Sequence, residues 1–376
     1  MKSNTMRLLA LFFAFSVLSC KKDKDPEAPV NPEPQPTEEI RISTGSEASM
    51  LLGDSLIIRA TVPCDSVYTS EWSIGETVLS TTDSLVLRKY KAGTYTVLYR
   101  AIKGSNTRSK EVKVDVQPVS VVSTEANKMY VTRLLEFMPA PGQFINKSPG
   151  NLESAVGILG KKGMVSLGAW GGYVVLGFDH KVINESGKHD IIIYNNAMAT
   201  FAEPGVVWVM EDKNGNGIAD DTWYEIKGSA SASPGYIRNY AVTYTRPNPL
   251  TGDVAWKDNK GNTGVVKTNT FHKQSYFPLW VEGSEYTLTG TCLPSDNINM
   301  SNPSYITSAP FEYGYADNTS GGDEIDIADA VDENGNSVSL QGIHFIKVQT
   351  GIQANMGWLG ELSTEVLGIA DASLIK

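Results

Sequence analysis

Oxygen-bearing residues recur at every second position within residues 211–226, which read EDKNGNGIADDTWYEI. Alternate residues of a short loop point inward, and this is how such a loop surrounds Ca²⁺, which takes about six to eight oxygen ligands. Gly217 stands where the loop must turn sharply. The sequence therefore predicts a calcium-binding loop, and its expected ligands are Asp212, Asn214, Asn216, Ile218 (through its backbone carbonyl), Asp220 and Asp221.

The carboxylate that closes an EF-hand loop is missing, because Trp223 occupies that position. Asp221, Glu225 or an oxygen from elsewhere in the fold could replace it. The alternative is a polar hairpin turn, in which Asp and Asn-Gly are favoured because they adopt left-handed backbone conformations. A plain hairpin does not need four spaced oxygens, so we favour the calcium loop and expect the ion to be structural.

Two apolar runs, residues 206–210 and 223–226, flank the loop and are typical of strands. Many later strand candidates alternate apolar and polar residues, as antiparallel strands with one wet face do. We expect a large antiparallel β-sandwich with long loops, on which binding surfaces are commonly built. Further strands are expected at residues 173–178, 190–194, 240–245, 286–292 and 344–350, and short helical turns at 152–159 and 325–331.

Residues 40–117 predict a separate, smaller β-sandwich. Short alternating strands at the regular spacing of such a domain are expected at residues 55–60, 69–74, 84–88, 93–101 and 110–116. Trp72 stands where an immunoglobulin-like domain has its central core tryptophan. No group of polar residues here suggests chemistry, so we interpret this domain as a spacer. The ligand-binding sandwich would then occupy residues 118–376.

The amino terminus has the pattern of an export signal. Lys2 and Arg7 precede an apolar run, residues 8–18, that is too short to span a bilayer, which predicts a signal peptide over residues 1–19. The run ends in VLSC, which resembles a lipobox, and this resemblance implies lipidation of Cys20. An ordinary cleaved signal is the alternative. Residues 20–39 are charged and proline-rich, as expected of a flexible tether.

The composition of the chain limits the classes of partner that it can bind. A net charge of −10 argues against binding to nucleic acid or to anionic lipid. No later segment has the length of a membrane span, so contact with a membrane is expected only through the lipid anchor. Cys64 and Cys292 fall in different predicted domains and are interpreted as buried free thiols.

Nothing in the sequence names a catalytic residue, and we do not expect an enzyme. His180, His189, His272 and His344 are interpreted as structural. An irregular acidic cluster is interpreted as a solvated face or a helix N-terminus, and residues 332–336 as a hairpin turn. The cluster comprises Asp323, Glu324, Asp326, Asp329 and Asp332.

Aromatic residues in or beside the predicted loops are the candidate ligand-binding groups. An aromatic side chain offers a large rigid contact surface that suits a sugar ring or a macrocycle. The alternative is that these rings fill the sandwich core. The residues proposed are Trp170, Tyr173, Trp256, Tyr276, Trp280, Tyr315 and Trp358.

Most of the chain resembles a family of surface lipoproteins of Bacteroidetes, in which a PKD-like module precedes a jelly-roll-like sandwich. The resemblance rests on AGTYTVLYRA in the smaller domain and on a series of runs in the larger one. These runs are GGYVVLGFDHKVIN, DIIIYNNAM, EPGVVWVMEDKNGNGIADDTWYEIKGS, RNYAVTYTRP and GIHFIKVQTGIQANMGWLGELSTEV. The charged KKDKD after Cys20 is similar to the export signals of such lipoproteins.

Some family members resemble lipoproteins that capture vitamin B12 and pass it to an outer-membrane transporter. The resemblance implies a lipid-anchored protein at the outer-membrane cell surface that captures a nutrient, above all a corrinoid. A glycan-binding lipoprotein is the first alternative. A glycoside hydrolase or esterase and a structural adhesion protein are the others.

Overall fold

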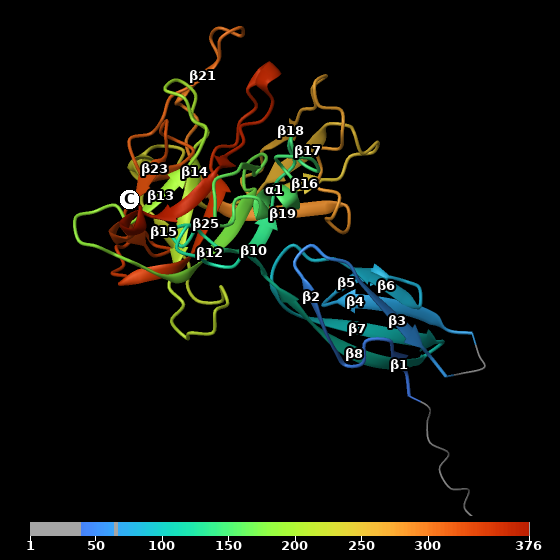
Figure 1. Ribbon diagram of the computed structural model, residues 1–376. Coiled ribbons are helices and arrows are strands. Elements are labelled where there is room, and N and C mark those ends of the chain that lie inside the picture. Colours follow the sequence, from blue (N-terminus) through green and yellow to red (C-terminus); the bar gives the residue numbers. More distant parts are fainter. Residues whose placement is uncertain (1–38, 64–66, 376) are drawn as a thin grey trace, which may run out of the picture. The chain divides into compact units, whose positions relative to one another are not determined.

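The computed structural model describes residues 39–63 and 67–375 and is nearly all β (Figure 1). This confirms the predicted all-β fold of antiparallel sheets. The predicted signal peptide, Cys20, nearly all of the tether and Cys64 lie outside the described residues. No helix among the described residues is long and apolar enough to cross a membrane.

The first sandwich consists of two sheets. A three-stranded sheet has the order β1 (Arg41–Ile42), β3 (Leu56–Thr61), β6 (Ser84–Leu87). A five-stranded sheet has the order β2 (Glu47–Leu51), β8 (Asn106–Gln117), β7 (Gly93–Lys103), β4 (Thr69–Ile74), β5 (Thr77–Ser80). Trp72 is fully buried, with its ring centroid 4.7 Å from that of Tyr99. The expected strands and core tryptophan are confirmed.

Strands β1–β8 pair only with one another among the described named strands, as the predicted boundary after residue 117 requires. Isolated backbone contacts do join residues on the two sides of this boundary. Ala92 N donates to Leu135 O, and Lys91 forms an isolated β-bridge with Glu136. The division into domains at this boundary stays a prediction.

A large sheet dominates the later part of the chain. Its order is β24 (Ala330–Val331), β15 (Tyr224–Ile226), β14 (Gly205–Met210), β25 (Gly342–Thr350), β12 (Tyr173–Ile183), β10 (Arg133–Met138), β9 (Val119–Ser120). A further strand, β22 (Tyr315–Ala316), also pairs with β14. The sequence correctly predicted β12, β14, β15 and β25, but not β10.

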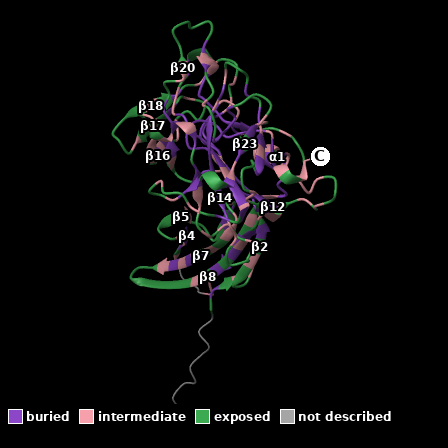
Figure 2. Ribbon diagram, turned by 90° about the vertical axis from the view of Figure 1, so that its left-hand side faces the viewer, coloured by how far each residue is buried: buried purple, intermediate pink, exposed green. Residues whose placement is uncertain are grey.

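Both faces of β14 are covered, since its six residues are all buried, as its apolar sequence indicates. Val207, Val209 and Ile346 pack on one face in a common core with Ile193 and Ile325. The latter two belong to a sheet of order β23 (Asp323–Ile325), β13 (Ile191–Tyr194), β27 (Gly368–Asp371). In Figure 2, buried residues gather beside the label of β23.

A four-stranded sheet carries the aromatic core of the second sandwich. Its order is β18 (Thr263–Val266), β17 (Val254–Asp258), β16 (Ile237–Thr245), β19 (Glu285–Cys292). Tyr240, Val242 and Leu288 pack around Trp170. The free thiol of Cys292 is buried in the same core, as expected, and burial raises its pKa to about 11.

Short elements complete the described chain. Strand β11 (Val165–Ser166) pairs with β26 (Glu365–Val366), and β20 (Ile298–Asn299) pairs with β21 (Thr307–Ser308). The helix α1 (Leu152–Val156) is a little over one turn long, and its N-terminus is capped by Asn151. Four 3₁₀ turns occupy Ser229–Ala232, Ile327–Asp329, Gly357–Leu359 and Ala372–Leu374. Helix is therefore found where the two short helical turns were expected.

Candidate functional site

A row of side chains crosses five strands of the large sheet. Directly paired residues of neighbouring strands project from the same face. The pairs are Glu225 with Trp208, Trp208 with Lys347, Lys347 with Val175, and Val175 with Glu136. The register thus places a lysine and a tryptophan between two glutamates, although the four residues are widely separated in sequence.

A groove of about 450 Å³ opens over this row. Trp208 and Lys347 supply part of its lining, and Trp223 joins them from the segment before β15. The opposite wall comes from β16, β19 and the turn after β24. The other lining residues are Glu225, Arg238, Asn239, Thr289, Gly290, Thr291, Val331, Asp332 and Glu333.

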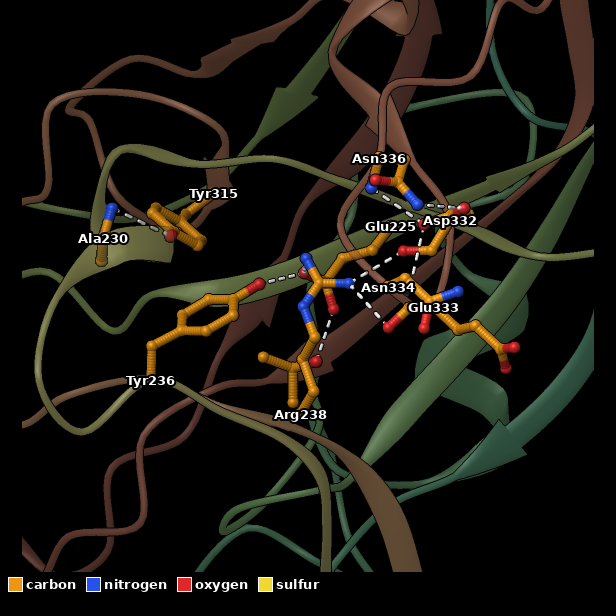
Figure 3. Close-up of polar contacts among 10 residues, drawn as sticks. Glu225, Ala230, Tyr236, Arg238, Tyr315, Asp332, Glu333, Asn334 and Asn336 are labelled. Atoms are coloured by element: carbon orange, nitrogen blue, oxygen red, sulfur yellow. Dashed lines mark hydrogen bonds and ion pairs between the residues drawn. The ribbon is translucent and has the colours of Figure 1, made fainter.

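Glu225 is buried at one side of the groove and its carboxylate is fully engaged (Figure 3). The hydroxyls of Tyr236 and Thr291 donate to it, and Arg238 Nη2 lies 3.4 Å from its Oε1. Arg238 Nη1 also donates to the Asp332 carbonyl at 2.9 Å. Burial, followed by the nearby Glu225 charge, raises the pKa of Tyr236, which stays a neutral donor.

Lys347 is the cation of this face. Its Nζ lies 3.9 Å from the ring centroid of Trp208 and 5.4 Å from that of Tyr173. Such contacts attract an ammonium to the negative face of the ring. Removal of the ammonium from solvent lowers the pKa of Lys347 to about 8. Within residues 39–63 and 67–375, Nζ has no hydrogen-bond or ion-pair partner.

Glu136, at the other end of the row, is already paired. Lys91 Nζ lies 3.0 Å from its Oε1, and the Tyr173 hydroxyl donates to its Oε2 at 2.7 Å. Both glutamates that flank Lys347 therefore have partners other than Lys347. The arrangement leaves one positive charge over an aromatic ring at the floor of an open groove.

A larger hollow, of about 780 Å³, lies along β4 of the first sandwich. Its acidic residues are Asp83, whose carboxylate accepts hydrogen bonds from Ser70, Tyr99 and Tyr68, and Glu71, which pairs with Arg100 at 2.6 Å. Because both carboxylates are satisfied within the protein, the hollow offers less to a ligand than the groove, despite its greater volume.

Three of the aromatic residues predicted to bind ligand are buried. Trp170, Tyr276 and Tyr315 have 0 to 1 % of their surface exposed. Trp170 and Tyr276 fill the core beneath the four-stranded sheet, and Tyr315 packs in another core with Val206 and Leu293. As a correction to the prediction, these three rings offer no surface to a ligand, because the sandwich core already covers them.

Of the other four predicted aromatics, Tyr173, Trp256 and Trp280 pack against one core, but the four do not line a common cavity. Tyr173 donates to Glu136, and Trp280 stacks on Tyr90 with ring centroids 4.5 Å apart. Trp256 lines a small cavity of about 60 Å³ beside β18. Trp358 is 57 % exposed, and its Nε1 donates to Pro303 O at 2.9 Å.

Sequence reasoning missed the residues of the groove. Trp208 and Trp223 stand in or beside runs that were read as core strands, and Glu225 was weighed only as a calcium ligand. One signal was available, since Lys347 is a lone cation among apolar residues of a strand, GIHFIKVQT. A charge at such a position is a known indicator of function.

The predicted calcium loop brings its oxygen-bearing side chains together. The Asp212 carboxylate accepts from Asn216 N at 3.2 Å and from Gly217 N at 2.8 Å. Asp220 accepts from the side-chain amides of Asn214 and Asn216 at 3.2 and 3.1 Å. The side-chain oxygens of Asn214 and Asn216 accept from Asn216 N and Ile218 N at 2.9 and 2.8 Å, so five oxygen-bearing side chains of the loop face its own backbone and one another. These donors fit a hard cation.

Two other turns of the chain test how specific this geometry is. Residues 258–262 (DNKGN) and 332–336 (DENGN) begin with an aspartate that accepts from the backbone N of Asn262 or Asn336, at 2.7 and 2.8 Å. The second confirms the expected hairpin turn at 332–336. Neither of these turns is followed by a pair of aspartates, so Asp220 and Asp221 are what sets residues 212–221 apart. Asp221 accepts from Lys213 N at 2.9 Å.

The loop is tied to the large sheet by two contacts. Asp212 N donates to His344 Nδ1 at 3.1 Å, and Arg133 Nη2 donates to Gly217 O at 2.5 Å. Gly215 and Gly217 have φ of 68° and 73°, which favours glycine at both. His344 belongs to β25, the strand that carries Lys347.

The acidic residues near β23 divide into two kinds. Asp326 caps the 3₁₀ turn Ile327–Asp329 through Ala328 N, as the interpretation of a helix N-terminus requires. Asp323 is buried, and its carboxylate accepts from Asn195 Nδ2 and from Asn318 N and Thr319 N; burial raises its pKa to about 6. Asp323 is therefore not part of a solvated face.

A second acidic group lies elsewhere in the sandwich. Among the described residues, Glu203, Asp317 and Glu365 each place one carboxylate oxygen within 4.8 Å of the others. Burial, followed by mutual repulsion, raises the pKa of Glu203 and of Asp317 well above the ordinary values. The group therefore holds protons that isolated carboxyls would release.

No family model matches the chain, and no curated protein matches it. Among solved structures, a quinonprotein alcohol dehydrogenase-like protein from Bacteroides thetaiotaomicron is 8 % identical over 61 % of this chain and 50 % of its own, with a TM-score of 0.22. Three N-terminal domains of the bacteriophage RB49 outer capsid protein Hoc are 12 % identical over 68 % of each chain, with a TM-score of 0.18.

A carbohydrate-binding module of the β-sandwich superfamily is 11 % identical over 89 % of this chain and 98 % of its own, with a TM-score of 0.16. The chain thus spans half the length of the first of these structures. Scores this low say nothing about the function of this chain.

Proposed function

We propose that this chain is a binding protein that captures a nutrient in the groove above Trp208 and Lys347. The observation that carries the proposal is an open groove that holds an indole ring and a cation without a partner. Aromatic rings and a few well-placed polar groups are the usual components of small-molecule sites. The walls add the hydroxyls of Thr289 and Thr291 and the amide of Asn239. Binding proceeds without chemical turnover.

The ligand class that we propose first is a corrinoid, as implied by the family resemblance. The groove, at about 450 Å³, would hold one edge of so large a molecule. Trp223 would lie against the flat macrocycle or its base. Under this proposal the protein is lipid-anchored through Cys20 at the cell surface and passes its ligand to an outer-membrane transporter.

A glycan is the second candidate, favoured by the size of the groove. A volume of about 450 Å³ matches a short oligosaccharide better than it encloses a macrocycle. A sugar ring would stack on Trp223, with hydroxyls paired to Asn239 and Thr289. The lipid anchor and surface location are the same in this alternative.

We also propose that residues 212–221 hold Ca²⁺, with Asp212, Asn214, Asn216, Asp220 and Asp221 and the carbonyl of Ile218 as ligands. Its role is structural, because the loop joins β14 to β15, the strands that carry Trp208 and Glu225. A cation that orders this connection would reduce the entropy lost when ligand binds.

The test is a titration of the soluble chain from residue 39 with cyanocobalamin, followed by a glycan array on the same preparation. Binding of either ligand that is lost in W223A supports capture in the groove. Absence of both, or binding that is unchanged in W223A, contradicts it. W256A is the matched control, because Trp256 is a partly buried tryptophan outside the groove.

A further inference from the structure

We infer that the groove recognises an anionic group of its ligand, a carboxylate or a phosphate, and that Lys347 Nζ is the partner of this group. This inference rests on the proposed function, that the groove holds a ligand, and it adds the charge of the ligand and the atom that recognises it. Three features of the groove carry it.

The first feature is an imbalance of charge around Lys347. Glu136 and Glu225, the carboxylates that flank it in the row, are paired with Lys91 and Arg238 at 3.0 and 3.4 Å. Tyr173, Tyr236 and Thr291 also donate to these two carboxylates. Lys91 and Arg238 are thus taken up by the two carboxylates of the row, and Lys347 is the cation of the row without a partner. A cation removed from water without a partner is costly, so an anion that enters the groove removes an existing penalty.

The second feature is the direction of the lysine. Trp208 lies directly opposite Lys347 on β14, and its ring holds Nζ at 3.9 Å from the centroid. The indole thus supports the ammonium from one side, and both residues line the groove. The lowered pKa, about 8, agrees with an ammonium that has lost water and gained no partner. At neutral pH the group is still mainly protonated, so it can donate charged hydrogen bonds.

The third feature is that neither acidic residue of the rim, Asp332 or Glu333, pairs with Lys347. The Asp332 carboxylate accepts from Asn334 N at 2.9 Å and from Asn336 N at 2.8 Å, within its own turn. Glu333 is exposed to solvent, where its charge is screened. Arg238, the other cation of the wall, is occupied by Glu225 and by the Asp332 carbonyl. Lys347 is thus the cation available to a ligand.

Two sources of the anionic group are compatible with the proposed ligands. A corrinoid carries a phosphodiester in its nucleotide loop, and an acidic glycan carries the carboxylate of a uronic acid. A neutral glycan carries neither. The requirement for an anionic group therefore separates corrinoids and acidic glycans from neutral glycans, which the aromatic residues of the groove do not.

The experiment is a titration of four proteins with glucose, glucuronate, inorganic phosphate and cyanocobalamin, followed by NMR. The proteins are wild type, K347M, K257M and W223A. Lys257 is the matched control, because it lies on β17, is exposed and pairs with Glu285 outside the groove. We expect glucuronate or phosphate to bind wild type and K257M, and to bind K347M about tenfold to a hundredfold more weakly. Cyanocobalamin should lose affinity in the same variant if the phosphodiester is the anion.

A pH series adds a readout that a structural role for Lys347 would not give. Anion affinity should be greatest below the pKa of about 8 and should then fall as the ammonium loses its proton. If glucose or cyanocobalamin binds in a W223A-sensitive way and K347M has no effect, the inference is wrong but the proposed function stands. If none of the probes binds, the inference and the proposed function both fail.

Discussion

Lys347 and Trp208 lie directly opposite each other on β25 and β14, with the ammonium 3.9 Å from the centroid of the indole ring. This pair makes a cation tolerable on a face where Phe345 and Met210 are buried. A side chain that served only the fold would be better replaced here by a hydrocarbon. The pair is therefore where stability and function should respond in opposite directions.

We predict that K347M stabilises the protein without ligand. At pH 7 the free energy of unfolding should rise by about 1 to 3 kcal/mol, because the folded state no longer holds an unpartnered ammonium. The gain should shrink from about pH 8 to 10.5, the folded and ordinary pKa values of Lys347, because wild type becomes more stable as its folded lysine is deprotonated. Urea unfolding at several pH values measures both. Destabilisation at pH 7 would mean that Lys347 has an internal structural role.

Ligand affinity should depend on Trp223 and not on Trp358. Trp223 lines the groove, whereas Trp358 is 57 % exposed on a separate 3₁₀ turn. Truncation of an aromatic contact at the centre of a site costs about 2 kcal/mol or more of binding free energy. W223A should therefore weaken binding by about thirtyfold, and W358A should leave it unchanged, in calorimetric titrations. Weaker binding in W358A together with unchanged binding in W223A would place the binding site near Trp358.

Chelation should lower the melting temperature if the loop at residues 212–221 holds calcium. A ligand that binds only the folded state stabilises it in proportion to the logarithm of its concentration. Addition of Ca²⁺ after EGTA should restore the melting temperature of wild type but not of D220N. D258N is the control, because Asp258 begins a similar turn without the additional acids. If neither the chelator nor D220N changes the melting temperature, residues 212–221 form a hairpin turn without calcium.

Stability should fall as pH rises through the range in which Glu203, Asp317 and Glu365 ionise. Their pKa values are raised in the folded state, so the folded protein binds more protons than the unfolded chain above the ordinary Glu value of 4.5. In E203Q one carboxyl of the group no longer titrates. The fall in the free energy of unfolding with rising pH should therefore be less steep above pH 4.5. Unfolding measured in acid and near neutrality tests this, and an unchanged slope would show that the group does not hold these protons.

His180 should stabilise the protein most in mild acid. Its Nε2 lies 3.0 Å from Asp371 Oδ2, and this contact, opposed by burial and aided by Asp179, raises the pKa of His180. A raised histidine pKa gives stability that is complete below the unfolded value of 6.5 and is lost as pH rises through the folded value. Burial opposes ionisation of Asp371, but the His180 contact lowers its pKa, so the carboxylate persists in mild acid. The difference in unfolding free energy between wild type and H180Q should thus be larger near pH 5.5 than near pH 8.5, by about 1 kcal/mol at most. An equal difference at both values would exclude a charged pair.

Local patterns predicted much of the fold because strands and turns are encoded locally. The alternation and turn residues around Trp72 indicated the first sandwich, and the apolar runs at β14 and β25 indicated two central strands. Strand β10, RLLEFM, was missed because four of its six residues are buried and the expected alternation is absent. A β-bulge between Leu134 and Glu136 disturbs that alternation further.

The groove could not be predicted in the same way, because it depends on which strands are neighbours. Glu136, Trp208, Glu225 and Lys347 meet only through the pairing of β10, β12, β25, β14 and β15. Local sequence patterns do not predict which strands pair. The aromatic residues chosen instead were selected for being near loops, and proximity to a loop did not distinguish Trp170, which is fully buried, from Trp358, which is exposed.

The position of β25 has a consequence for the order of folding. This strand joins β12 to β14, yet it is made after both, with more than a hundred residues of intervening chain between it and each of them. Until residues 342–350 are available, β12 and β14 lack a common neighbour and their apolar faces stay open. Closure of such distant contacts is slow. We therefore expect the groove to be among the last parts of the protein to form, and the exposed edges of β12 and β14 to be where an incomplete chain first aggregates.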